Sequence, residues 1–271
     1  MNLLRLLPLL WLVWASSLGA APTRALPALQ MEVYGVDRGL PHNTVLSLAQ
    51  TPDGFLWIGT WEGLARFDGA RFKAPPPSAP ASLRESGVLV LHSGSDGSLW
   101  IGTQGGGIYR YHEGRYTVES APGEPLDAHV LSLLVARDGE VYAGTSDGQV
   151  LRRGEAGFVA IEGFGDGPAG SVYALAQDRA GRVIALRDSS LWQLEAQRPV
   201  LLELQWPGAP GLPYRIAPAA GGGLWLATQQ GLYRLAADLR TVEPAIHSAS
   251  TSRVMEDKGG QLWLASEPLG L

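Results

Sequence analysis

The side chains of this sequence that could transfer protons are its histidines and a few carboxylates. His42 and His129 occupy equivalent positions, each shortly before an alternating apolar stretch, and with Glu62 they could form a general acid and base. None of the 5 histidines lies in a His-x-His or His-Glu-x-x-His pattern, so the spacing predicts no metal site. The sequence also lacks a Gly-x-Ser-x-Gly motif, a phosphate-binding loop and a dinucleotide fingerprint. We therefore expect no catalytic residues, no cofactor and no bound metal.

The segments that must position these side chains repeat along the chain. DGFLWIGTWEGLARFDG at 53–69 returns as DGSLWIGTQGGGIYRY at 96–111 and as DGEVYAGTSDGQVLRR at 138–153. A large apolar residue follows each turn at intervals of 43, 42, 42, 41 and 38 residues, at Trp57, Trp100, Tyr142, Ile184, Trp225 and Trp263. Repeats of about 40–45 residues without a helical period are typical of propeller blades.

Each repeat unit has the pattern of four short strands separated by tight turns. In the first unit the alternating stretch 45–50 is followed by turn residues at 51–54, and further short apolar runs are separated by Trp61-Glu62-Gly63 and Asp68-Gly69. The chain is therefore expected to be all-β, a β-propeller of four-stranded blades over residues 31–271. The expected blades are 42–83, 84–125, 126–167, 168–211, 212–248 and a truncated 249–271. We expect an incomplete ring of five full blades and half of a sixth, out of about seven, with a further strand at Met31–Tyr34.

The N-terminus and the composition indicate an exported protein. Residues 1–21 combine Arg5, an apolar run and a small-residue stretch, which predicts a signal peptide, and 22–30 would be a linker. A chain without cysteine forms no disulfides, so its core and its strand pairing must hold the fold. The formal net charge of −5 argues against a nucleic-acid partner.

Several motifs resemble one known family. GLPHNTV at 39–45, DGFLWIGT at 53–60 and GLARFDG at 63–69 are similar to the two-component regulator propeller repeat of bacterial periplasmic sensor regions, and LWIGT, LWLAT and LWLAS recur at 99–103, 224–228 and 262–266. The resemblance implies the N-terminal, periplasmic, non-catalytic sensing part of a signal-transduction receptor. In such receptors an immunoglobulin-like module, one inner-membrane span and a histidine kinase or diguanylate cyclase follow, and the receptor can be a homodimer. We expect none of those later parts within residues 31–271, which the propeller repeats occupy.

Repetition separates expected scaffold residues from expected ligand-binding residues. A ligand meets a propeller once, so aromatic residues that recur in several blades are expected to pack between blades: Trp57, Trp100, Tyr142, Trp225 and Trp263. Binding is expected where the repeats differ, on the loops at one end of the blades. That face should carry a mixed polar and aromatic set suited to a sugar-like or peptide-like ligand: His42, Asn43, Trp61, Glu62, Gln104, His129, Asp147, Arg187, Asp188, Tyr214, Arg215, Gln229 and Gln230.

Two other classes stay open at the level of sequence. An exported propeller enzyme, similar to the lyases that open cyclic antibiotics, could use the histidines and Glu62. A propeller that binds only other proteins would expose an apolar patch on the same face.

Overall fold

The computed structural model describes residues 32–105, 107–119, 128–164, 170–195, 198–208, 211–247 and 251–266. The predicted signal peptide (1–21), the predicted linker (22–30) and Met31 lie outside the described residues. Five four-stranded antiparallel sheets and one two-stranded sheet follow one another within those residues, each a simple up-and-down meander. The prediction of an all-β propeller with four-stranded blades is confirmed.

The first three sheets each begin with a six-residue strand, which is the innermost strand of the blade. Blade 1 contains β1 (Val45–Gln50), β2 (Leu56–Thr60), β3 (Gly63–Phe67) and β4 (Phe72–Lys73). Blade 2 contains β5 (Val88–Ser93), β6 (Leu99–Thr103), β7 (Ile108–His112) and β8 (Arg115–Val118). Blade 3 contains β9 (Val130–Val135), β10 (Val141–Thr145), β11 (Val150–Gly154) and β12 (Gly157–Ala160).

The remaining sheets continue the same order. Blade 4 contains β13 (Val172–Gln177), β14 (Val183–Arg187), β15 (Ser190–Leu194) and β16 (Pro199–Leu201). Blade 5 contains β17 (Pro213–Pro218), β18 (Leu224–Thr228), β19 (Gly231–Leu235) and β20 (Val242–His247), and blade 6 contains β21 (Thr251–Glu256) and β22 (Leu262–Ser266). A 3₁₀ turn, η1 (Val36–Arg38), precedes blade 1, and α1 (Ser82–Glu85) links blades 1 and 2.

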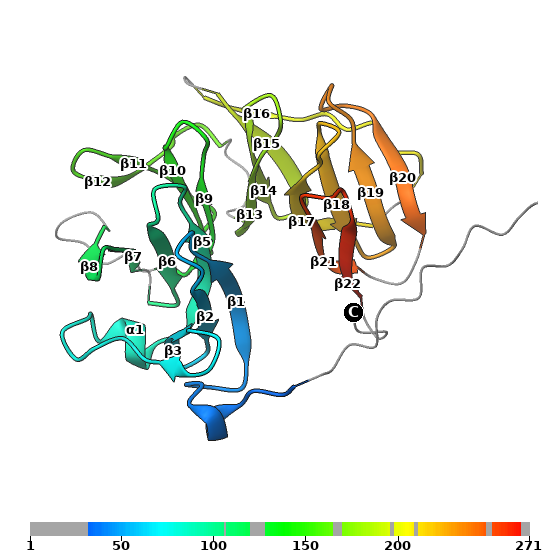
Figure 1. Cartoon of the computed structure of the whole chain (residues 1–271). Helices are drawn as coiled ribbons and strands as arrows, with labels where there is room; N and C mark the ends of the chain where they lie inside the picture. The colour runs from blue at the N-terminus through cyan, green and yellow to red at the C-terminus, as the bar shows by residue number, and fades with distance from the viewer. Residues whose placement is uncertain are drawn as a thin grey trace, which may run out of the picture. The chain divides into compact units, whose positions relative to one another are not determined.

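The blades stand side by side, and each inner strand contacts the inner strand of the next blade (Figure 1). The core consists of separate apolar clusters, most of which lie between one blade and the next. Between blades 1 and 2, the Trp57 ring lies 4.7 Å from the Tyr111 ring, beside the buried Leu91 and Ile101. Because each sheet buries one face against its successor, the repeated aromatic of the second strand can fill the gap between them.

The five repeated aromatic residues differ in how far they are buried. Trp57 and Trp100 are buried, with 1% and 3% of their surfaces exposed, whereas Tyr142 and Trp225 are half-buried. Trp263 departs from the expected position between blades, because 47% of its surface is exposed. No blade is described beyond β22, so no following blade covers this ring within the described residues.

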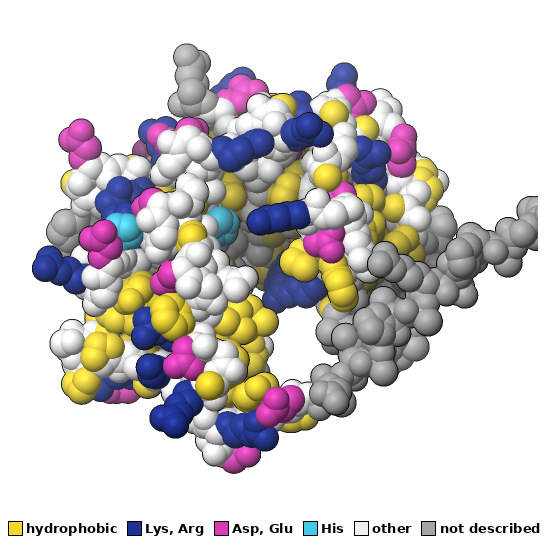
Figure 2. Space-filling model, viewed as in Figure 1, with side chains coloured by type: hydrophobic (Ala, Val, Ile, Leu, Met, Phe, Trp, Pro, Cys, Tyr) yellow, Lys and Arg dark blue, Asp and Glu magenta, His cyan; other side chains and the backbone are white. Residues whose placement is uncertain are grey.

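The segment before blade 1 is not the strand that the sequence pattern predicted. Residues 32–35 belong to no strand, and the Tyr34 ring packs edge-on against Phe67 at 5.2 Å and Phe72 at 5.7 Å. Asn43 fixes this course, because its Oδ1 accepts a hydrogen bond from the Val36 amide at 3.0 Å. Figure 2 shows hydrophobic side chains gathered over the region where Figure 1 draws β1 to β3.

Candidate functional site

One hydrogen bond recurs at the loop end of the blades and fixes the geometry of the candidate site. The first residue after the second strand donates its amide to the carbonyl of a residue just before the first strand. This bond joins Trp61 to Thr44 at 3.2 Å, Gln104 to Gly87 at 2.8 Å, Ser146 to His129 at 2.9 Å and Asp188 to Ser171 at 2.9 Å. The links between blades and the turns between the second and third strands therefore lie at the same end, as the sequence analysis assumed.

A cleft of about 420 Å³ opens at this end between blades 1 and 2. Three residues proposed from sequence line it: Trp61, Glu62 and Gln104. Trp61 has 47% of its surface exposed, although it is a large aromatic residue in a two-residue turn. The cleft is completed by Glu85, Ser86, Gly87 and Gly105.

The short helix α1 brings Glu85 to the cleft. The Leu83 side chain of this helix is fully buried in the core between blades 1 and 2. The Ser82 hydroxyl donates a hydrogen bond to the Tyr109 hydroxyl of blade 2 at 2.6 Å, and these two contacts hold the helix against blade 2. Glu85 itself is exposed, with Arg84 4.0 Å away. Two carboxylates, Glu62 and Glu85, thus share a cleft with an exposed indole and an amide.

His129 adjoins this cleft from the next blade. Its Nδ1 donates to the Gln104 carbonyl oxygen, and its amide donates to the Ser146 Oγ at 2.9 Å. Asp147, in the turn that follows, accepts hydrogen bonds from the Thr145 hydroxyl and from Gln149 Nε2. These two residues therefore hold the loops of blades 2 and 3 in place.

Most of the other residues proposed from sequence lie in the loops without joining the cleft, whereas Arg215 lines a separate cavity between the inner strands. The His42 Nδ1 accepts from the Thr44 amide at 2.9 Å, and Tyr214 donates its hydroxyl to the Thr228 carbonyl at 3.1 Å. The Arg187 guanidinium is bound by the carbonyls of Phe164 at 2.7 Å and Gly170 at 3.3 Å. Two further residues, Gln229 and Gln230, are exposed in the β18–β19 turn.

The acid–base arrangement considered from sequence is not assembled at the loop end. Within the described residues no hydrogen bond or ion pair joins His42, His129 and Glu62, and no group of three His, Cys, Asp or Glu is placed to hold a metal ion.

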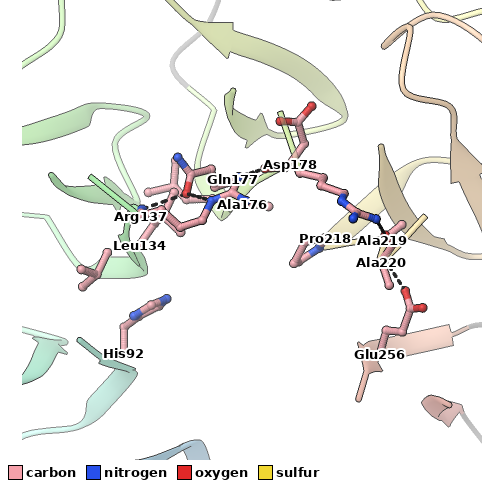
Figure 3. Close-up of a pocket in the computed structure, with 13 residues that line it drawn as sticks. His92, Leu134, Arg137, Ala176, Gln177, Asp178, Pro218, Ala219, Ala220 and Glu256 are labelled. Atoms are coloured by element: carbon pink, nitrogen blue, oxygen red, sulfur yellow. Dashed lines mark hydrogen bonds between the residues drawn. The ribbon is translucent and has the colours of Figure 1, made fainter. Parts of the chain in front are cut away.

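A second cavity, of about 550 Å³, lies at the opposite end of the inner strands, where sequence reasoning proposed no site (Figure 3). His92 lines it, and its buried Nδ1 has no hydrogen-bond partner in the described part of the chain. Burial lowers the pKa of His92, so the imidazole is neutral at pH 7. Arg137 and Gln177 are hydrogen-bonded to each other on its wall, and Glu256 accepts from the Ala220 amide.

The family sequence model described as Two component regulator propeller matches residues 39–62. The resemblance inferred from the sequence is confirmed. The matched segment runs from the link before β1 to the β2–β3 turn, and it therefore ends at Trp61 and Glu62, on the cleft. No curated protein sequence matches the chain.

Solved structures with this fold come from several classes of protein. One is the extracellular domain of the candidate hybrid two component system BT3049 from B. thetaiotaomicron, with a TM-score of 0.69 and 22% identity over 88% of this chain and 34% of that one. Another is virginiamycin B lyase from Staphylococcus aureus, with a TM-score of 0.68 and 13% identity over 83% of this chain and 78% of that one. The WD40 β-propeller domain of Doa1 has a TM-score of 0.63 and 14% identity over 82% and 75% of the two chains. At these identities the likeness establishes the propeller fold alone.

The chain spans about a third of the length of the BT3049 structure. Among the described residues, no helix has the length and apolar character that a membrane crossing requires.

Proposed function

We propose that this propeller is the ligand-sensing, non-catalytic part of a signal-transduction receptor exported to the periplasm, with the cleft between blades 1 and 2 as its ligand site. The observation that carries the proposal is the exposed Trp61, which lies beside Glu62 and Gln104 in a cleft at the end of the matched repeat. A large apolar ring left in water at a concave site is typical of a surface that is covered when a partner binds.

The lining of the cleft suits a neutral, hydroxyl-rich ligand or a ligand with an amine. The Trp61 indole offers a flat face on which a sugar ring or an aromatic peptide side chain can stack. The carboxylates of Glu62 and Glu85 accept hydrogen bonds from hydroxyl or ammonium groups, and the Gln104 amide both donates and accepts. Two carboxylates in one cleft repel an anionic ligand.

A binding role fits the histidines better than catalysis does. The Nδ1 atoms of His42 and His129 are already hydrogen-bonded to backbone groups, which gives both rings a local structural use. A general base must instead reach the proton that it removes from a substrate. Signal output by a histidine kinase or a diguanylate cyclase, an inner-membrane anchor and a homodimer belong to the same proposal and rest on the family resemblance.

The test is a thermal-shift and calorimetric screen of neutral sugars, amino sugars and short peptides on the full chain. We expect one class to raise Tm saturably and Trp61→Ala to weaken its binding by about fivefold or more, because stacking on one aromatic ring contributes about 1–3 kcal/mol. Val159→Ala removes a similarly exposed apolar side chain from β12, on the outer edge of blade 3, and should bind as the unsubstituted protein does. Equal binding by all three proteins would reject the cleft, and conversion of the ligand during incubation would support an enzyme instead.

A further inference from the structure

Each inner strand has the same irregularity near its start. The register between the first and second strands shifts by one residue between Val45 and Ser47, and equivalent shifts occur in β5, β9, β13, β17 and β21. A bulge of this kind leaves one residue unpaired and redirects the side chains around it. The position directly after the bulge is therefore comparable in all six blades.

This position carries a small or β-branched residue in four blades and an arginine in two. Blades 1 to 4 have Ser47, Val90, Ser132 and Ala174, whereas blades 5 and 6 have Arg215 and Arg253. Close packing accounts for the serines. Ser47 and Ser132 lie opposite Gly59 and Gly144, where a Cβ added to the glycine would lie 2.4 Å from the serine Oγ, so there is little space for a larger side chain. Packing gives no reason for two long cationic side chains at adjacent repeats.

The two arginines line a cavity of about 730 Å³ that is bounded by the six inner strands. Its other walls are mostly apolar, with Leu46, Leu89 and Leu131 on one side, and Tyr173 contributes a phenol. No aspartate or glutamate is among the described residues that line it. Arg215 is half-buried and donates one hydrogen bond, from Nη1 to the Tyr214 carbonyl at 2.7 Å, whereas Arg253 is exposed and reachable from solvent.

Among the described residues, no carboxylate lines the cavity or forms an ion pair with either arginine. Burial, and after it the positive charge of Arg253, lower the pKa of Arg215 to about 10. Both side chains therefore remain cationic at pH 7 and repel each other in a partly enclosed space. An anion between the two guanidinium groups would offset this repulsion.

We infer that Arg215 and Arg253 form an anion-binding site in the axial cavity, which takes the carboxylate, sulfate or phosphate group of a small ligand. Guanidinium groups bind these oxyanions through paired, charge-assisted hydrogen bonds. The leucine walls would contact the apolar or ring portion of the same ligand, and the volume is that of a small-molecule site. The site is distinct from the Trp61 cleft, whose two carboxylates oppose anions.

The first experiment measures binding of sulfate, phosphate, acetate and succinate to the full chain by calorimetry and thermal shift, at millimolar concentration and with NaCl matching the ionic strength. We expect saturable binding of at least one anion, with at least tenfold weaker binding in Arg215→Gln and in Arg253→Gln. Arg115→Gln removes an exposed arginine from β8 and should leave the affinity unchanged. The ranking of the four anions distinguishes a phosphate or sulfate site from a carboxylate site.

A second experiment needs no variant and therefore does not depend on whether the substituted chains fold. Phenylglyoxal modifies accessible arginines, and peptide mapping by mass spectrometry locates the modified positions. Bound anion should slow modification of Arg215 and Arg253 and leave Arg115 unaffected. Absence of saturable binding for all four anions, or equal binding by the variants together with no selective protection, overturns the inference. Trp61→Ala should retain anion binding, so failure of the cleft proposal and failure of this one are separable.

Discussion

Trp57 and Trp263 occupy the same position in the repeat, yet their surroundings are opposite. Trp57 has 1% of its surface exposed, its Nε1 donates to the Thr51 hydroxyl at 3.0 Å, and its ring contacts Tyr111 of blade 2. Trp263 has 47% of its surface exposed, and its Nε1 donates to Asp257 at 3.0 Å within the same hairpin. The same indole in the repeat therefore contributes to a core in blade 1, where blade 2 packs against it, and is half exposed in blade 6, after which no further blade is described.

The largest expected difference between these two regions is the cost of removing the indole. Trp57→Ala should lower the free energy of unfolding by about 3–5 kcal/mol, because it leaves a cavity between blades 1 and 2. Trp263→Ala should cost under about 1 kcal/mol, since its ring is half exposed. Urea unfolding followed by circular dichroism measures both. Equal losses would show that the exposed indole has a packing role that its surroundings do not reveal.

A smaller loss of stability should follow from adding one methyl group at Gly59, where β2 of blade 1 lies close to the backbone of blade 2. A Cβ at Gly59 would lie 2.6 Å from the Val88 carbonyl oxygen, which is backbone of blade 2 and cannot easily move. Gly59→Ala should therefore destabilise the protein by about 1–3 kcal/mol. The position is already alanine in blades 5 and 6, at Ala227 and Ala265, so the requirement for glycine is local to the early blades.

Gly105→Ala is the matched control for that substitution, because an added Cβ there meets nothing within 4 Å. Its thermal unfolding should be close to that of the unsubstituted protein. An unchanged Tm in Gly59→Ala as well would mean that blades 1 and 2 can separate by a few tenths of an ångström without loss of stability.

The parts of the fold that depend on local pattern could be predicted from sequence. Turn residues and apolar alternation identified the strands of each blade, and the turns between the second and third strands placed Trp61, Glu62 and Gln104 at one end. Glu85 was missed because α1 lies in an irregular link that has no periodic signal. Arg253 was missed because it lines the axial cavity only as a result of the register shift between Thr251 and Arg253, and a register shift cannot be read from residue types.

The segment before blade 1 shows the opposite error. The residues Met31–Tyr34 have a strand-like composition, but the described part of that segment makes no strand pairing. Tyr34 instead packs on Phe67 and Phe72, the two rings that correspond in blade 1 to Tyr111 and Tyr116 of blade 2, where Trp57 is accommodated. Phe67 and Phe72 are half-buried, and no strand that could pair with this segment is among the described residues, so the aromatic contact is what positions Tyr34 there.

The smallest expected effect concerns the contact between blades 5 and 6, where the indole of Trp225 is only half-buried and donates a hydrogen bond to a carboxylate of the next blade. Glu256 accepts hydrogen bonds from Trp225 Nε1 and from the Ala220 amide, both at 2.8 Å, and first the Trp225 bond and then the Ala220 bond lower the pKa of its carboxyl group. A lowered pKa in the folded state means that the carboxylate stabilises the fold above the ordinary titration range of glutamate, and that this contribution is lost as the pH falls through the lowered pKa. Solvent screens the group, so the contribution should stay under about 1 kcal/mol.

Glu256→Gln should remove that part of the acid dependence and lower stability slightly at pH 7, with little further loss on acidification. Urea midpoints measured from pH 7 to pH 3 give the comparison, and Glu155→Gln, which removes a carboxylate from the β11–β12 turn, is the control. If Glu256→Gln followed the same acid curve as the unsubstituted protein, the Trp225 bond would contribute nothing to holding blade 6 on blade 5. Among the described contacts, those of β21 with β17 and β18 would then hold blade 6 on blade 5.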